Sequence, residues 1–264
     1  MTFFVAAMWS ISALFGLDLL VRLLMSARSS SSIDLVSGVL CQAIAFSVAL
    51  FGVVMVHDRE RSLGEVLAFR RPLASLCLLA VGIGIALQGP LGLIATAINQ
   101  RFPQPEHEIE VLRDLLTAPL VRDKVALLLS AGLVGPFVEE MFFRGALLRN
   151  LRRQHASGIT LLGVSLLFAA AHLDPRNFVP DFLGGLAMGY VRILSGSLWP
   201  AFLLHAAFNS SSVLVALTRG PDADLFTQIQ SFAAVPITLG LFALYGMLAL
   251  KSGKAAEARA NDTA

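Results

Sequence analysis

Long apolar runs separated by short polar segments make up most of the chain. A run of about 17–25 apolar residues is long enough to cross the hydrocarbon core of a bilayer as a helix. Shorter helices are tolerated in a membrane where they line a cavity enclosed by protein. The pattern therefore predicts eight helices, the fifth and sixth unusually short, at residues 3–25, 35–56, 73–98, 124–148, 158–172, 181–195, 197–217 and 232–250. We expect an all-α fold: a polytopic membrane helix bundle with a cavity enclosed by helices four to seven.

The composition agrees with a membrane location. Hydrophobic residues make up 56% of the chain and charged residues only 14%, whereas a soluble domain has about 25% charged residues. No internal repeat, low-complexity tract or long linker divides the sequence, so residues 1–264 are expected to form a single membrane domain. The sequence has no basic tract with interleaved aromatic residues, which argues against a nucleic-acid partner. The expected partner is the lipid bilayer.

The charges between the apolar runs predict an orientation. If both termini are cytoplasmic, eleven basic residues fall on that side and seven on the other. Because basic loops favour the cytoplasmic side, we expect a multi-pass protein of the cell membrane with both termini in the cytoplasm. On the opposite side, residues 106–116 begin with glutamates and continue with leucines at helical spacing, which predicts a short amphipathic helix at the interface.

Charged residues interrupt the fourth apolar run. Carboxylates inside a bilayer are costly, so Glu139 and Glu140 mark a candidate functional site. Arg144 lies four residues after Glu140 on the same helical face, which predicts an ion pair that lowers the cost of both charges. Glu139 points about 100° away from Glu140. It is therefore expected to face the cavity as a general base, beside a kink at Pro136 that would admit water.

Two further polar motifs lie in later helices. The first is Phe168-Ala-Ala-Ala-His172, whose alanines allow close helix packing beside the imidazole. The second is His205-Ala-Ala-Phe-Asn209, in which the imidazole and the amide project side by side. Each motif alone is a weak signal. Counted along their helices, Glu139 and His205 lie at similar depths, about 12 Å from the helix ends, so their side chains can meet.

The three motifs together resemble the CPBP family of intramembrane proteases, which includes CAAX-prenyl endopeptidases and bacteriocin-processing or immunity proteins. The resemblance rests on the order of Glu139-Glu140-x-x-x-Arg144, Phe168-x-x-x-His172 and His205-x-x-x-Asn209 on successive helices. It includes the flanking Phe143-Arg144-Gly145 and Leu198-Trp199-Pro200 and extends over residues 124–215, the expected catalytic core region. The first three helices carry no diagnostic residues.

The resemblance implies a glutamate-dependent endopeptidase whose cavity opens toward the cytoplasm. Its substrate would be a membrane-associated or lipidated peptide or protein. By position, Glu139 would activate the attacking water with help from His172, and His205 and Asn209 would stabilise the oxyanion. Glu140 and Arg144 would support the base structurally.

Metal dependence is left open by the sequence, and no cofactor is expected to be required. The family has also been called metalloprotease, and Glu139, His172 and His205 with a water would be a known type of catalytic zinc set. Asn209 is a poor zinc ligand and a good oxyanion donor, which favours the mechanism without metal. Two other functions remain as alternatives: a non-catalytic immunity or scaffold protein, and a transporter with buried charges near broken helices.

Overall fold

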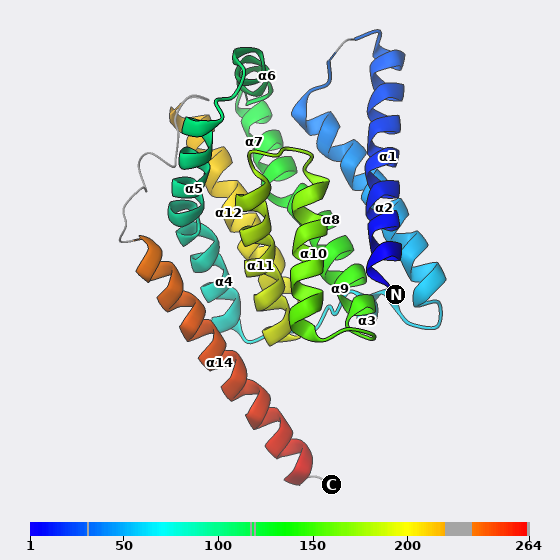
Figure 1. Ribbon diagram of the computed structural model, residues 1–264, viewed down its shortest axis with the longest axis vertical. Helices are drawn as coiled ribbons and strands as arrows, with labels where there is room; N and C mark the ends of the chain where they lie inside the picture. Colours follow the sequence, from blue (N-terminus) through cyan, green and yellow to red (C-terminus); the bar gives the residue numbers. More distant parts are fainter. Residues whose placement is uncertain (31, 117, 119, 220–233, 263–264) are drawn as a thin grey trace.

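The computed structural model describes residues 1–30, 32–116, 118, 120–219 and 234–262. Every element in these ranges is a helix, which confirms the all-α membrane bundle (Figure 1). In chain order the elements are α1 (Phe3–Arg28), α2 (Leu35–His57), α3 (Leu63–Val66), α4 (Ala74–Ala86), α5 (Gln88–Arg101), α6 (Glu106–Leu116), α7 (Val121–Leu129), η1 (Ser130–Val134), α8 (Gly135–Glu140), η2 (Met141–Leu147), α9 (Leu148–Leu151), α10 (Ser157–Ala171), α11 (Phe178–Ser195), α12 (Leu198–Arg219) and α14 (Ala234–Asp262).

The number of membrane crossings differs from the prediction. Among the described residues, six helical stretches are long and apolar enough to span a bilayer: Phe3–Arg28, Leu35–His57, Ala74–Arg101, Val121–Leu151, Leu198–Thr218 and Ala234–Gly253. The two short predicted helices correspond to α10 and α11, and neither is among the six, so the count of eight transmembrane helices is not confirmed. The predicted start of the last helix, at residues 232 and 233, lies outside the described residues.

Polar residues set where several helices begin. Asp34 caps α2 by accepting a hydrogen bond from the Ser37 amide across 2.9 Å. Burial raises the pKa of Asp34, but hydrogen bonds from Ser37 and Arg28 outweigh it and keep the pKa below its ordinary value. The predicted run at 73–98 divides at Leu87, and Pro90 falls in the first turn of α5, where its missing N–H is harmless.

The fourth apolar run forms one continuous helical path that includes two π-helical turns, η1 and η2. In η1 the Gly135 amide bonds to the Ser130 carbonyl five residues back, and Pro136 follows at the start of α8. The wider turn accommodates the proline, which lacks an amide hydrogen, and helical structure continues on both sides of it. Glu139 and Glu140 lie between the two π-helical turns, in a region where such turns often mark functional sites.

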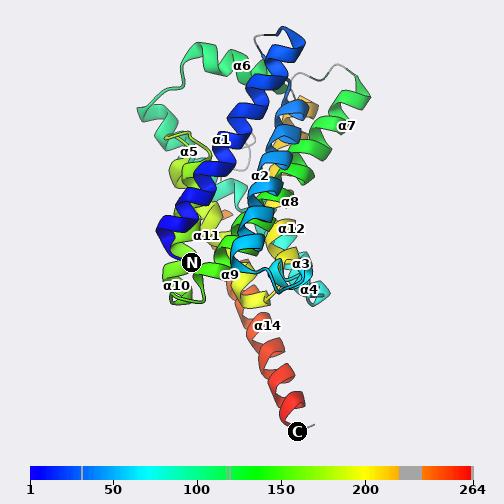
Figure 2. The same ribbon diagram turned by 90° about the vertical axis from the view of Figure 1, so that its right-hand side faces the viewer.

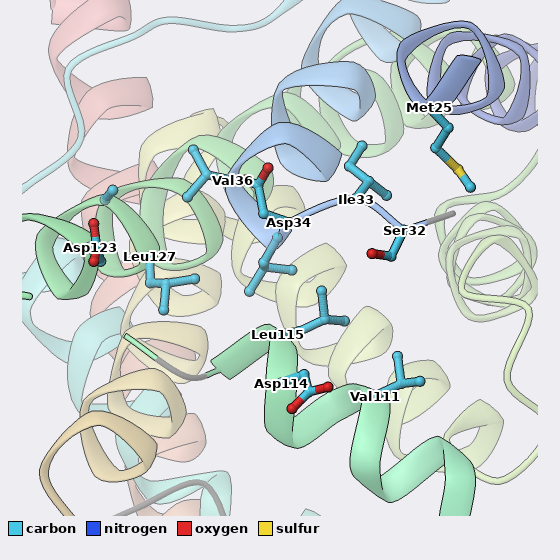
Figure 3. A pocket seen from close by; sticks show the side chains of 12 residues that line it. Met25, Ser32, Ile33, Asp34, Val36, Val111, Asp114, Leu115, Asp123 and Leu127 are labelled. Carbon is cyan, nitrogen blue, oxygen red and sulfur yellow. The ribbon is translucent and has the colours of Figure 1, made fainter. Parts of the chain in front are cut away.

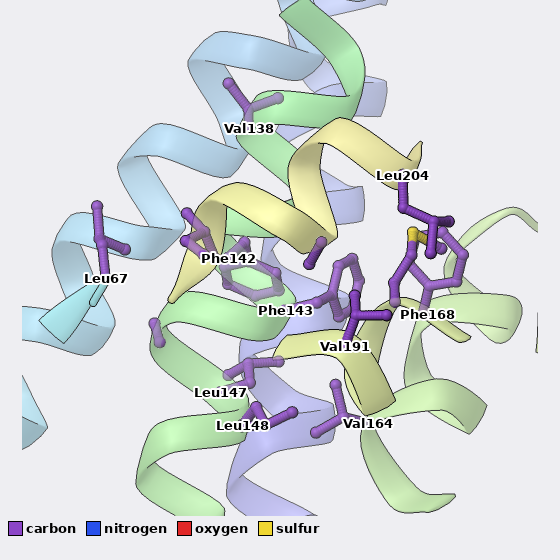
Figure 4. Close-up of a cluster of buried hydrophobic side chains, with 14 of the residues drawn as sticks. Leu67, Val138, Phe142, Phe143, Leu147, Leu148, Val164, Phe168, Val191 and Leu204 are labelled. Atoms are coloured by element: carbon purple, nitrogen blue, oxygen red, sulfur yellow. The ribbon is translucent and has the colours of Figure 1, made fainter. Parts of the chain in front are cut away.

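The apolar core surrounds η2. Phe142, Phe143, Leu147 and Leu148 are almost fully buried and pack with side chains of α10, α11 and α12, as Figure 4 shows. α4 lies very close to α12 at Gly84. A Cβ atom at this position would lie only 2.3 Å from the carbonyl oxygen of Leu204, the residue before His205. α1 packs on α2 at the right-hand side of the bundle in Figure 1, the side that faces the viewer in Figure 2, and is mostly exposed.

Both chain ends lie at the same end of the bundle, the lower end in Figure 1. The connections between α2 and α3, α3 and α4, and α9 and α10 also lie there, and they contain Arg59, Arg61, Arg70, Arg71, Arg152 and Arg153. The α1–α2 turn and α6, the predicted amphipathic helix, lie at the upper end. The basic residues therefore gather at the end that holds the termini, whose cytoplasmic location remains a prediction.

Candidate active site

A buried ion pair anchors the candidate site. Arg144 donates from Nη1 to Glu140 Oε1 across 2.7 Å, and neither side chain has exposed surface. The guanidinium also donates from Nη2 to the Gly185 carbonyl across 3.2 Å and lies 4.3 Å from the centre of the Phe168 ring. The pair expected from the four-residue spacing is therefore present, and it ties η2 to α10 and α11.

His205, on α12, lies between the two glutamates. Its Nδ1 is 3.1 Å from Glu140 Oε1, and its Nε2 is 3.9 Å from Glu139 Oε2. The imidazole is buried. Because an ionised carboxylate accepts hydrogen bonds only, the contact with Glu140 assigns a proton to Nδ1 and leaves Nε2 facing Glu139.

Glu139 is held by a residue that the sequence analysis did not single out. Gln42, on α2, donates from Nε2 to Glu139 Oε1 across 2.6 Å. Glu139 is only 8% exposed, and within the described part of the chain its Oε2 has no hydrogen-bond partner. Gln42 could have been noticed in the sequence as a lone amide within an apolar run. The sequence pattern does not show, however, that its partner is Glu139, 97 residues away.

His172 directly follows α10. Its Nδ1 is 2.9 Å from the carbonyl oxygen of Phe168, one turn earlier. The Phe168 ring packs edge-on against both imidazoles, with ring centres 4.7 Å from His172 and 5.7 Å from His205. The carboxylate of Asp181 lies 3.9 Å from His172 Nδ1. The sequence analysis also passed over Asp181, whose signal was an isolated acid at the start of an apolar segment.

Two cavities meet at His172. One, of about 360 Å³, is lined by His172, Glu139 and Gln42 together with apolar side chains of α1 and α2. The other, of about 90 Å³, is lined by His172, Asp181, His205 and Asn209. Each cavity is lined by different predicted residues, and only His172 is shared.

Asn209 does not line the cavity that contains Glu139. It lines the smaller cavity, and its Nδ2 donates to the Ala131 carbonyl across 3.3 Å. The structure thus brings Glu139, His205 and Glu140 into direct contact range and places His172 and Asn209 on cavity walls beside them.

The described residues do not fit a metal ion. Among them, no three histidine, cysteine, aspartate or glutamate side chains converge closely enough to hold one. The candidate ligands Glu139, His172 and His205 are therefore not among such a group in the described residues.

A third, larger cavity of about 780 Å³ lies at the upper end of the bundle. Figure 3 shows Val111 and Leu115 of α6 facing Ile33 and Val36 across it. Leu35 lines both this cavity and the one that contains Glu139. Leu35 is the first residue of α2, next to the α1–α2 turn. The expected opening of the site toward the cytoplasm stays a prediction.

Comparisons with known proteins agree with this site. Residues 121–211, which contain all three motifs, match the family described as type II CAAX prenyl endopeptidase Rce1-like. This match supports the resemblance of these residues to the CPBP family of intramembrane proteases. An uncharacterized 24.3 kDa protein of Escherichia coli is 37% identical over 99 residues, which is 36% of this chain and 46% of that protein. The chain thus matches less than half the length of this relative. No solved structure matches the chain.

Proposed function

We propose that the protein is an intramembrane glutamate-dependent endopeptidase that hydrolyses a peptide bond in a membrane-associated or lipidated peptide or protein. The observation that carries this proposal is the Glu139 carboxylate, which is buried on a cavity wall with one oxygen held by Gln42 and the other without a partner. A carboxylate left in this state is suited to take a proton from water. The family match over residues 121–211 supports the assignment.

In the proposed reaction, Glu139 Oε2 accepts a proton from a water oriented by His172. The water oxygen attacks the carbonyl carbon of the substrate, and the negative charge moves to the carbonyl oxygen. Glu139 then returns the proton to the departing amine nitrogen as the C–N bond breaks. Every proton is accounted for by the water, the acid and the amine, so the reaction needs no further reactant.

The oxyanion would be stabilised by His205 and Asn209. His205 can donate from Nε2 while Nδ1 bonds to Glu140 only if both nitrogens carry protons, so this role requires the imidazolium. Asn209 would donate from the amide that now bonds to Ala131. Each donor of this kind is worth about 3–4 kcal/mol in comparable sites.

The substrate class follows from the surroundings of Glu139. The cavity beside it is lined mainly by leucine, valine and phenylalanine side chains of α1, α2 and η2. Such walls favour an apolar or lipid-bearing segment over a free polar peptide. The description of the matching family points to a prenylated peptide as the first substrate to test.

Cleavage by the purified protein tests the proposal. Wild type and Glu139→Gln would be incubated with fluorogenic peptides that differ only in a C-terminal prenylcysteine. We expect cleavage by wild type and none by Glu139→Gln, with equal melting temperatures. Glu60→Gln, which removes an exposed loop carboxylate, should cleave normally. Full activity of Glu139→Gln would overturn the proposal, and a folded wild type inert on every peptide would favour an immunity or scaffold protein or a transporter.

A further inference from the structure

Asp181 is a half-buried acid next to the site that the proposed mechanism does not use. It lies in the first turn of α11, and its side chain is only 25% exposed. Within the described residues, its Oδ2 has no hydrogen-bond partner. By contrast, the nearby Asp174 accepts hydrogen bonds from the Arg176 amide and the Asn177 side chain. Leaving a carboxylate buried and unsatisfied is costly, so the position of Asp181 needs an explanation.

The packing of α10 on α11 fixes where this acid points. A Cβ on Gly185 would lie 3.1 Å from the Ser165 side chain, and a Cβ on Gly189 would lie 2.3 Å from Leu161. The two helices are therefore antiparallel and nearly in backbone contact along this face. Asp181 lies one turn before Gly185 on the same face, which carries its carboxylate to the end of α10.

At that end the carboxylate faces His172. Asp181 Oδ2 is 3.9 Å from His172 Nδ1, the atom that also contacts the Phe168 carbonyl across 2.9 Å. Both the carbonyl and the carboxylate are acceptors, so together they keep the proton of His172 on Nδ1. The Nε2 atom is then the unprotonated one, available to a water in the cavity.

We propose that Asp181 is a positioning residue that acts through His172, holding the imidazole in the orientation and tautomer that present Nε2 to the attacking water. This inference rests on the proposed function. Carboxylates that orient a working histidine in this way recur in hydrolytic sites. No bond is made or broken by Asp181, and the proton balance of the proposed reaction is unchanged.

Steady-state kinetics of Asp181→Asn and Asp181→Glu test this role. Asp181→Asn should lower kcat about 10–100-fold with little change in KM, because it acts on the histidine and not on the substrate. Asp181→Glu should recover most of kcat, since the longer acid can still reach Nδ1. Glu60→Gln, which removes an exposed acid in the loop between α2 and α3, should match wild type. An unchanged kcat, or a loss confined to KM, would overturn the inference.

A double-mutant cycle based on melting temperatures tests whether Asp181 acts through His172 without a cleavage assay. Asp181→Asn and His172→Gln should have melting-temperature effects that do not add in the double variant, because the two side chains interact. Additive effects would mean that Asp181 does not act through His172. The proposed function fails separately, if Glu139→Gln cleaves as well as wild type.

Discussion

The neutral side chain of Gln42 determines which oxygen of the Glu139 carboxylate is free to accept a proton. Its amide occupies Glu139 Oε1, so the free acceptor of the carboxylate is Oε2, which faces His205. The hydrogen bond also fixes the rotamer of Glu139 toward the cavity that both residues line. At the residue scale, the proposed base therefore depends on a contact from a helix outside the family match.

Replacing Gln42 with leucine should slow cleavage without unfolding the protein. Leucine has a similar volume but cannot donate to Glu139, and a hydrogen bond to a charged group is worth about 1.5–3 kcal/mol, which corresponds to roughly a 10–100-fold loss of kcat. Cleavage rates and melting temperatures would be measured beside those of Gln100→Leu, which removes an exposed amide. Wild-type kcat in Gln42→Leu would show that this contact does not position the base.

At the scale of elements, the π-helical turns and the buried ion pair act on one segment. η2 begins directly after Glu140 and contains Arg144, so the pair closes across the widened turn. The same four-residue spacing occurs at Asp18 and Arg22 on α1, also with a 2.7 Å contact, but there both side chains are exposed. The two ion pairs have the same spacing and contact distance, and they differ in the burial of their side chains.

Arg144→Ala should destabilise the protein strongly, whereas Arg122→Ala, which removes the exposed cation beside Asp123 at the start of α7, should have little effect. Loss of Arg144 leaves the fully buried Glu140 without its cation, at a cost of about 3–5 kcal/mol. An exposed pair contributes far less. Thermal unfolding in detergent, with the yield of folded protein, would measure both. Equal melting temperatures for the two variants would contradict this division.

The contact between α4 and α12 gives a second prediction at this scale. In Gly84→Ala the new methyl group would lie 2.3 Å from the Leu204 carbonyl oxygen, a backbone atom that cannot move aside alone. The two helices must separate, which should cost about 1–3 kcal/mol and reduce cleavage, because His205 is the next residue. Gly240→Ala on α14 places its methyl group in open space and should be tolerated. A Gly84→Ala protein with wild-type stability and rate would show that this approach is less tight.

At the scale of the whole molecule, the bundle brings acid and imidazole groups from separate helices together. We therefore predict that the protein purifies without stoichiometric zinc and that cleavage survives thorough chelation, since the described residues offer no converging ligand set. Elemental analysis and activity after dialysis against a chelator would test this. One tightly held zinc per chain, with activity lost on its removal and restored by its return, would make Glu139, His172 and His205 ligands.

The sequence alone determined the features that depend on local geometry. Apolar run lengths predicted the all-α membrane bundle, because a bilayer requires long helices whose backbone groups are satisfied internally. The spacing of Glu140 and Arg144 predicted their pair, because a helix places residues four apart side by side. The motifs predicted a family that the comparison over residues 121–211 supports. The number of crossings was less certain, since α10 and α11 are too short or too polar to read as ordinary spans.

Only the tertiary structure decided which side chains meet. The Gln42–Glu139 bond joins residues 97 positions apart, and the His205–Glu140 contact joins residues 65 apart. Such contacts depend on how closely helices approach, which Gly84 and Gly185 set through backbone packing that no residue pattern reveals. The same packing divided the predicted single cavity into two that share His172 and brought Asp181 to that histidine. Local spacing thus fixed the pairs within a helix, and packing between helices fixed the site.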